Sequence, residues 1–210
     1  MKKKKFLMKK VKALLFAILL NVPLTILAQD VQINEMNFPD ENFRNYLLEQ
    51  SYGKDGVITE EEIKKITRMS PYGKNISSLK GIEYFTALEE LFCFTNRIST
   101  LDLSKNVALK ELNCGENLLS TLDVSGCTAL TTLNCCKNQL TTLNVSGCAS
   151  LTDLRCYSNL LTTLNLSTNA ELSVLYCYGN QLTTLNVSGC TSLVNLRCYS
   201  NQLTALNVSG

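Results

Sequence analysis

The chain has 210 residues, with 20 basic and 18 acidic side chains, ten cysteines, no histidine and no tryptophan. Without histidine the chain lacks the usual general base, the partner of a histidine-assisted serine or cysteine nucleophile, and the commonest ligand of catalytic zinc. Its sequence also contains no glycine-rich phosphate-binding loop. This composition disfavours an enzyme, and we expect neither catalytic residues nor a cofactor.

Residues 1–28 have the composition of a secretory signal peptide. They contain seven lysines and no acidic residue, and an apolar run extends from Ala13 to about Leu20, ahead of Pro23 and Ala28. The run is short for a membrane-spanning helix, so we expect cleavage after Ala28 and export to the medium or the cell surface. An uncleaved anchor helix is the alternative. The remaining 13 basic and 18 acidic residues give a net charge of −5, which points to neither nucleic acid nor an anionic membrane as partner.

Residues 29–65 are acidic and carry a helical pattern. In the stretch FPDENFRNYLLEQ, Pro39 and Asp40 are typical of a helix start, and Phe43, Tyr46 and Leu47 fall on one helix face. A loop and a second helical stretch, EEIKKITRM, follow. Helix, twelve-residue loop and helix is the outline of a calcium-binding EF-hand.

The loop at residues 51–62 matches an EF-hand loop only in part. Gly56 takes its sixth position, Asp55 its fifth and Glu62 its twelfth, but Ser51 and Gly53 stand at the first and third positions, which require carboxylate or amide oxygens. Asp55 and Glu62 are therefore weak candidates for a metal site. We expect a degenerate loop within a helical hairpin that caps the repeats that follow, with a calcium-responsive module as the alternative.

From residue 66 to residue 210 the sequence repeats itself. A divergent copy of 22 residues is followed by six copies of 21 residues that read L-x-x-L-x-C-x-x-N-x-L-x-x-L-x-(V/L)-S-x-x-x-x. Two columns recur without exception, one of cysteine and one of asparagine: Cys93, Cys114, Cys135, Cys156, Cys177 and Cys198; Asn96, Asn117, Asn138, Asn159, Asn180 and Asn201. A fixed period of this length predicts a solenoid.

The motif L-x-x-L-x-C-x-x-N-x-L resembles the leucine-rich repeat from Ile66 to Gly210, and its 21-residue period is similar to the short nested class of bacterial repeats. The stretches NFPDENFRNYL and ISSLKGIEYFTALEEL also resemble the opening of secreted repeat proteins of gut bacteria. The resemblance implies a concave strand face that binds a partner, and an internalin-like role. From the alternating pattern itself we expect a mainly parallel β solenoid with extended return segments.

The leucines and cysteines of each copy should point inward and form ladders with rungs about 4.8 Å apart. Cysteine serves there as a small hydrophobe. A further column at a corner of the coil exchanges cysteine with asparagine, so no bridge or metal depends on it: Asn106, Cys127, Cys148, Asn169 and Cys190. We expect reduced, shielded thiols, with only the outward-facing Cys136 readily labelled. Five disulfides in an exported chain are the alternative.

The outward strand positions beside the cysteine column differ from copy to copy. They hold Phe92 and Phe94, Asn113 and Gly115, Asn134 and Cys136, Arg155 and Tyr157, Tyr176 and Tyr178, and Arg197 and Tyr199. Tyrosine and arginine are common in binding hot spots, and contiguous exposed aromatic side chains form a patch that a monomer tends to avoid. We therefore predict the following ligand-binding residues: Phe92, Phe94, Arg155, Tyr157, Tyr176, Tyr178, Arg197 and Tyr199. Aromatic residues that merely suit a strand surface are the alternative.

Together these features predict a secreted or cell-surface binding protein that engages an extracellular protein, peptide or glycan through its concave face. A passive structural spacer within a longer surface protein is the alternative. Counted from Leu88, the sixth copy stops three residues short of completion, and no cap follows. We therefore expect either a longer form with more repeats or a C-terminal cap, or edge-to-edge self-association.

Overall fold

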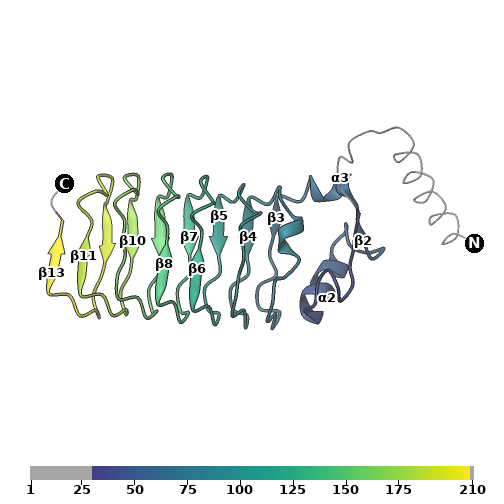
Figure 1. The fold of residues 1–210 in the computed structure, drawn as a ribbon, viewed down its shortest axis with the longest axis horizontal. Helices are drawn as coiled ribbons and strands as arrows, with labels where there is room; N and C mark the ends of the chain where they lie inside the picture. Colours follow the sequence, from purple (N-terminus) through teal and green to yellow (C-terminus); the bar gives the residue numbers. More distant parts are fainter. Residues whose placement is uncertain (1–29, 209–210) are drawn as a thin grey trace, which may run out of the picture. The chain divides into compact units, whose positions relative to one another are not determined.

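The computed structural model describes residues 30–208, which form a row of stacked coils preceded by a short helical segment (Figure 1). The predicted signal peptide and its cleavage site lie outside the described residues. Within residues 30–208, no helix is long and apolar enough to cross a membrane.

The segment before the coils contains two helices and a small β-ribbon. Helix α2 (Glu41–Glu49) begins at Asp40, whose carboxylate accepts the Phe43 N–H, and α3 (Glu60–Ile63) begins with a capping box between Thr59 and Glu62. Strand β1 (Val31–Gln32) pairs antiparallel with β2 (Val57–Ile58). The second helical stretch is shorter than the sequence pattern suggested, because the chain enters strand β3 at Arg68.

Seven parallel strands form a long sheet, one strand for each coil. In order of position they are β3 (Arg68–Met69), β4 (Glu90–Phe92), β5 (Glu111–Asn113), β7 (Thr132–Asn134), β9 (Asp153–Arg155), β10 (Val174–Tyr176) and β12 (Asn195–Arg197). Leucine pairs with leucine from Leu91 through Leu112 to Leu196, and Met69 takes this place in β3. The predicted parallel solenoid is thus confirmed.

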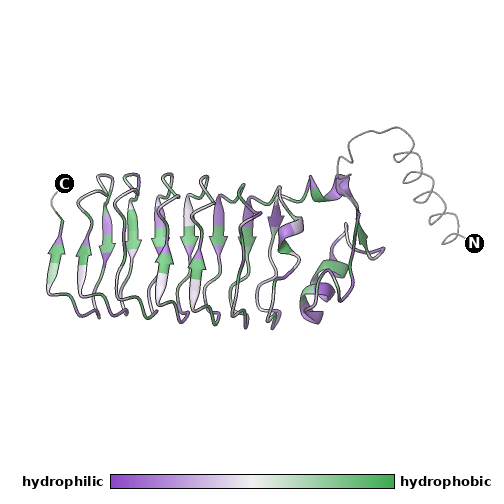
Figure 2. Cartoon of the chain, viewed as in Figure 1, coloured by the Kyte–Doolittle hydropathy of each residue, from purple (hydrophilic) through white to green (hydrophobic). Residues whose placement is uncertain are grey.

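The return side of the coils is also extended, as expected. It forms two short parallel pairs, β6 (Thr121–Asp123) with β8 (Thr142–Asn144) and β11 (Thr184–Asn186) with β13 (Ala205–Asn207). The first coil instead contains the 3-10 helix η1 (Ile82–Tyr84). Hydrophobic residues recur at matching places from coil to coil, as Figure 2 shows in green.

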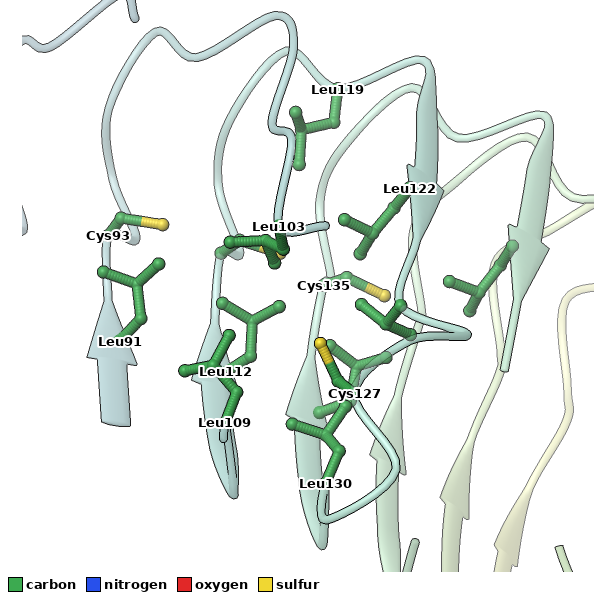
Figure 3. Packing of buried hydrophobic residues seen from close by; sticks show 14 of the residues in the cluster. Leu91, Cys93, Leu103, Leu109, Leu112, Leu119, Leu122, Cys127, Leu130 and Cys135 are labelled. Carbon is green, nitrogen blue, oxygen red and sulfur yellow. The ribbon is translucent and has the colours of Figure 1, made fainter. Parts of the chain in front are cut away.

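The interior between the two sides is filled by stacked leucine and cysteine side chains (Figure 3). Leu91, Cys93, Leu112 and Cys135 have no exposed surface. All ten cysteines carry free thiols, and nine of them are buried. Burial raises the pKa of the Cys93 thiol to about 12, because a thiolate would be desolvated there. The ladder cysteines therefore act as small apolar side chains with protonated thiols.

The asparagine column ties each coil to its neighbours. The Asn117 side-chain amide donates to the carbonyls of Cys93 (3.0 Å) and Cys114 (3.1 Å), and its Oδ1 accepts the Ile98 N–H (3.0 Å). The same bonds recur at each later asparagine of the column. Asparagine is required because one side chain must both donate and accept within a buried turn.

Asparagine and cysteine can replace each other in the corner column because each donates a hydrogen bond there and neither needs to accept one. Asn106 donates through Nδ2 to the carbonyls of Ile82 and Phe85, both at 3.0 Å. The Cys148 thiol donates to the Val124 carbonyl of the preceding coil at 3.2 Å. Cysteine and asparagine exchange at this corner because each supplies a donor to the coil before it.

The helical segment is bonded directly to the first coil. Besides capping α2, Asp40 accepts the N–H groups of Ser77 (2.8 Å) and Ser78 (3.2 Å) through its second carboxylate oxygen. The Tyr46 hydroxyl accepts the Ser70 N–H at 2.9 Å. Buried aromatic rings, with Phe38 at their centre, lie between this segment and the coils. This arrangement suits a cap over the apolar end of the solenoid.

Candidate binding face

The outward face of the long sheet is the face that the sequence analysis predicted to be concave and ligand-binding. Two rows of side chains run along it, one immediately before and one immediately after each ladder cysteine. The first row consists of Phe92, Asn113, Asn134, Arg155, Tyr176 and Arg197; the second row consists of Phe94, Gly115, Cys136, Tyr157, Tyr178 and Tyr199. In-register pairing from β4 to β12 places equivalent residues side by side.

Three tyrosines of the second row form a continuous stack. The ring centroids of Tyr157 and Tyr178 are 4.5 Å apart with the planes inclined by 8°, and those of Tyr178 and Tyr199 are 4.5 Å apart with an inclination of 10°. This separation matches the distance of about 4.8 Å between neighbouring strands. The ring faces contact one another, so the stack presents ring edges on the outward face of the sheet.

In the adjacent first row, Tyr176 lies between two arginines. The guanidinium carbon of Arg197 is 4.5 Å from the Tyr176 ring centroid, and that of Arg155 is 5.5 Å from it, both within cation–π range. Arg155 also forms two hydrogen bonds with Asp153, at 3.1 Å and 2.8 Å. Asn195 donates to the Tyr176 hydroxyl at 3.1 Å.

We call these six side chains the tyrosine–arginine cluster: Arg155, Tyr157, Tyr176, Tyr178, Arg197 and Tyr199. They come from β9, β10 and β12 and the residues that follow these strands. Both arginines are exposed, Tyr199 is 59% exposed, and the other three tyrosines are partly exposed. Stacking and cation–π contacts therefore hold a large aromatic surface in place without burying it.

The two predicted phenylalanines lie at the other end of the face. Arg68 covers Phe92 at 4.6 Å from the ring centroid, and Phe94 stacks on Tyr72 at 4.9 Å with nearly parallel rings. Tyr72 is 54% exposed and was missed by the sequence analysis. It precedes Phe94 by 22 residues, the spacing of the divergent first copy, and this spacing was the signal that could have identified it.

Two intervening coils separate the phenylalanines from the cluster. Their second-row residues are Gly115 and Cys136, and a Cβ atom on Gly115 would lie 3.1 Å from the Cys136 Sγ. The expectation that Cys136 is exposed is wrong, because only 4% of it is accessible. Burial raises the pKa of its thiol despite a contact with the Tyr157 hydroxyl that lowers it. The eight predicted residues thus form two groups on one face.

The weak metal candidates are both engaged in local hydrogen bonds. Asp55 accepts the Val57 N–H at 3.1 Å. Glu62 accepts the N–H and hydroxyl of Thr59 at 2.8 Å and 2.7 Å. Among residues 30–208, no group of three or more Cys, Asp or Glu side chains is placed to hold a metal ion. The loop at residues 51–62 therefore has a structural explanation in the β2 turn and the α3 cap.

Comparison with known proteins gives no matching protein-family model. A segment of 70 residues, 33% of this chain, is 38% identical to internalin J of Listeria monocytogenes serotype 4b (strain F2365), of which it covers 8%. The functional domain of internalin J, described as including a cysteine ladder, is 27% identical over 86% of this chain and 54% of that domain, with a TM-score of 0.40.

Two other solved structures superpose more closely. A leucine-rich-repeat protein of Leptospira interrogans has a TM-score of 0.57 and 27% identity, over 61% of this chain and 36% of that one. Internalin C2 of Listeria monocytogenes has a TM-score of 0.62 and 21% identity, over 85% of this chain and 91% of that one. The fold of this chain is a leucine-rich-repeat solenoid. The matched segment covers only 8% of the length of internalin J, and this chain covers 36% of the Leptospira chain.

Proposed function

We propose that the protein is exported and, without catalysing a reaction, binds a protein partner outside the cell through the tyrosine–arginine cluster. The observation that carries this proposal is the stacked, solvent-facing arrangement of three tyrosines beside a tyrosine held between two arginines. The similarity of the chain to internalins supports a secreted or surface location, and so does the lysine-rich and apolar start of the sequence.

The coil itself does not require these side chains. Glycine and cysteine occupy the second row in the coils of β5 and β7, where Gly115 and Cys136 stand in the place of tyrosine, and the hydrogen bonds of the asparagine column continue unchanged through them. Stability comes from the inward leucine, cysteine and asparagine columns. The tyrosines are therefore free to vary for another purpose, and stacking orders them before any partner arrives, which lowers the entropic cost of binding.

A protein partner fits the cluster better than a neutral glycan. Sugars stack on the open faces of aromatic rings, but both faces of Tyr178 are covered by Tyr157 and Tyr199, and Arg155 and Arg197 contact the Tyr176 ring. The cluster instead offers ring edges, hydroxyl groups and guanidinium groups. These are the groups that carry hot spots in protein interfaces.

The test is the capture of extracellular proteins by the immobilised mature chain, which we define as residues 29–210. Replacing Tyr157, Tyr178 and Tyr199 by serine should abolish capture of the specific partner while the circular dichroism spectrum stays unchanged. The matched control changes three threonines on the return strands to serine: Thr121, Thr142 and Thr184. A folded tyrosine variant that captures the partner as well as the original chain, or a control variant that loses it, would overturn the proposal.

A further inference from the structure

We propose that Arg197 is an anchoring site for a carboxylate, so that the partner presents an acidic protein segment to the tyrosine–arginine cluster. This inference rests on the proposed function and specifies the chemistry of the partner. Three observations carry it. Arg197 is exposed, it lies over the Tyr176 ring, and the uncharged Asn195 stands where an acidic residue would neutralise it.

Two coils of the cluster carry arginine at the same first-row position but differ two residues earlier. In β9 the earlier residue is Asp153, whose carboxylate forms a bidentate pair with Arg155. In β12 it is Asn195, which donates to the Tyr176 hydroxyl instead. The exchange of aspartate for asparagine leaves Arg197 without a carboxylate partner among residues 30–208.

The guanidinium of Arg197 is held in place without being neutralised. Its contact with Tyr176 is closer than that of Arg155, 4.5 Å against 5.5 Å, and Asn195 fixes the hydroxyl end of the same ring. A planar guanidinium supported on a ring face keeps its N–H edge free to bind a carboxylate in the bidentate manner that Asp153 adopts with Arg155. The geometry needed to receive an acid is thus already present within the chain.

Other cations on the strands of this face are neutralised. Arg68 pairs with Glu90, and Arg155 pairs with Asp153. Just beyond the strands, Lys110 and Lys137 pair with Glu89 and Glu116 of the preceding coils. Exposed pairs of this kind weaken the attraction for an outside anion. An acidic segment would therefore dock at the β12 end of the face, beside the tyrosine edges.

The chain supplies its own matched variants for a test. Asn195→Asp reproduces the Asp153 arrangement and should neutralise Arg197 internally. Asp153→Asn reproduces the Asn195 arrangement and should release Arg155. Both exchanges put a residue that one coil already uses into the other coil, so the fold should be kept, and circular dichroism verifies this.

The probe is a hexapeptide of alternating glutamate and glycine, compared with the same peptide containing glutamine, with binding followed by NMR titration of the mature chain. We expect the glutamate peptide alone to bind. Asn195→Asp and Arg197→Gln should each weaken it by on the order of tenfold, and Asp153→Asn should strengthen it severalfold. Equal binding of the two peptides, no binding of either, or an unchanged affinity in Arg197→Gln would overturn the inference.

Two further results separate this inference from the proposed function. If the captured partner is lost in the tyrosine variant but retained in Asn195→Asp, the binding face is correct and the acidic anchor is wrong. Polygalacturonate serves as a second probe for an acidic glycan. If it binds more tightly than the glutamate peptide and responds to Asn195→Asp, the carboxylate belongs to a glycan and the protein segment is refuted.

Discussion

The buried thiols make the stability of the solenoid sensitive to alkaline pH. Burial raises the pKa of Cys93 and Cys177 from an ordinary value of 9.0 to about 12, and raises the pKa of Cys114, Cys135 and Cys156 well above 9.0. A thiol is neutral when protonated, so the folded chain keeps these protons at pH values where the unfolded chain loses them. The contribution of the buried thiols to the free energy of unfolding is fully present below pH 9, and it is lost as the pH rises toward the pKa values of the folded chain.

The size of the effect follows from the number of ladder cysteines. One pKa unit corresponds to about 1.4 kcal/mol. Between pH 8 and pH 10, each thiol that ionises only in the unfolded chain lowers the free energy of unfolding by roughly 1–2 kcal/mol. The five ladder cysteines with raised pKa values together account for about 7 kcal/mol, comparable with the whole stability of a typical domain.

The assay is urea unfolding of the mature chain at pH 8, 9 and 10, followed by circular dichroism with a reductant present. We expect the free energy of unfolding to fall steeply across this range. The control is the double variant Cys135→Ala, Cys156→Ala, which should start less stable at pH 8 but lose about 3 kcal/mol less between pH 8 and pH 10. Equal stability at pH 8 and pH 10, or the same loss in the double variant, would refute the reasoning.

Three other perturbations test the columns, the thiols and the cap. Asn159→Ala should destabilise the chain by about 2–4 kcal/mol, because it leaves the buried Leu140 N–H unpaired and removes one of the two hydrogen bonds that the Cys135 and Cys156 carbonyls each accept. The exposed Asn144→Ala should cost about 1 kcal/mol or less, as thermal unfolding would measure. Alkylation of the native protein, read by mass spectrometry, should label the partly exposed Cys198 before Cys136, and the reverse order would contradict the burial described. Asp40→Ala should remove the α2 cap and two bonds to the first coil, which costs about 2–4 kcal/mol and should speed hydrogen exchange in α2 while the distant coils keep their protection.

The repeat period was sufficient to predict the solenoid and its interior. Leucine, cysteine and asparagine recur at fixed positions because each is required there for burial or for bonding between coils, so recurrence itself reveals the inward columns. Asn117 illustrates this, since its amide and carbonyl groups both satisfy backbone groups of neighbouring coils. The outward rows could likewise be assigned from the alternation of side chains along a strand.

What the pattern did not reveal are contacts between outward residues of different coils. Cys136 was predicted to be exposed because it lies on the outward face. Its small side chain instead lies against Gly115, contacts the Tyr157 side chain and is buried. The pair between Asp153 and Arg155 was missed for a related reason. Alternation gives the face on which a residue lies, but it does not give the rotamer that brings two side chains together.

The equal spacing of the coils has a consequence for how such a chain changes in evolution. Every 21-residue copy presents the same leucine, cysteine and asparagine columns to the copy before it and to the copy after it. Duplicating or deleting one whole copy, such as residues 129–149, joins columns that already match, whereas a shorter insertion or deletion within a strand shifts the rest of that copy off its ladder. The length of the binding face and its outward residues can therefore be altered by unequal recombination, independently of the interior that keeps it folded.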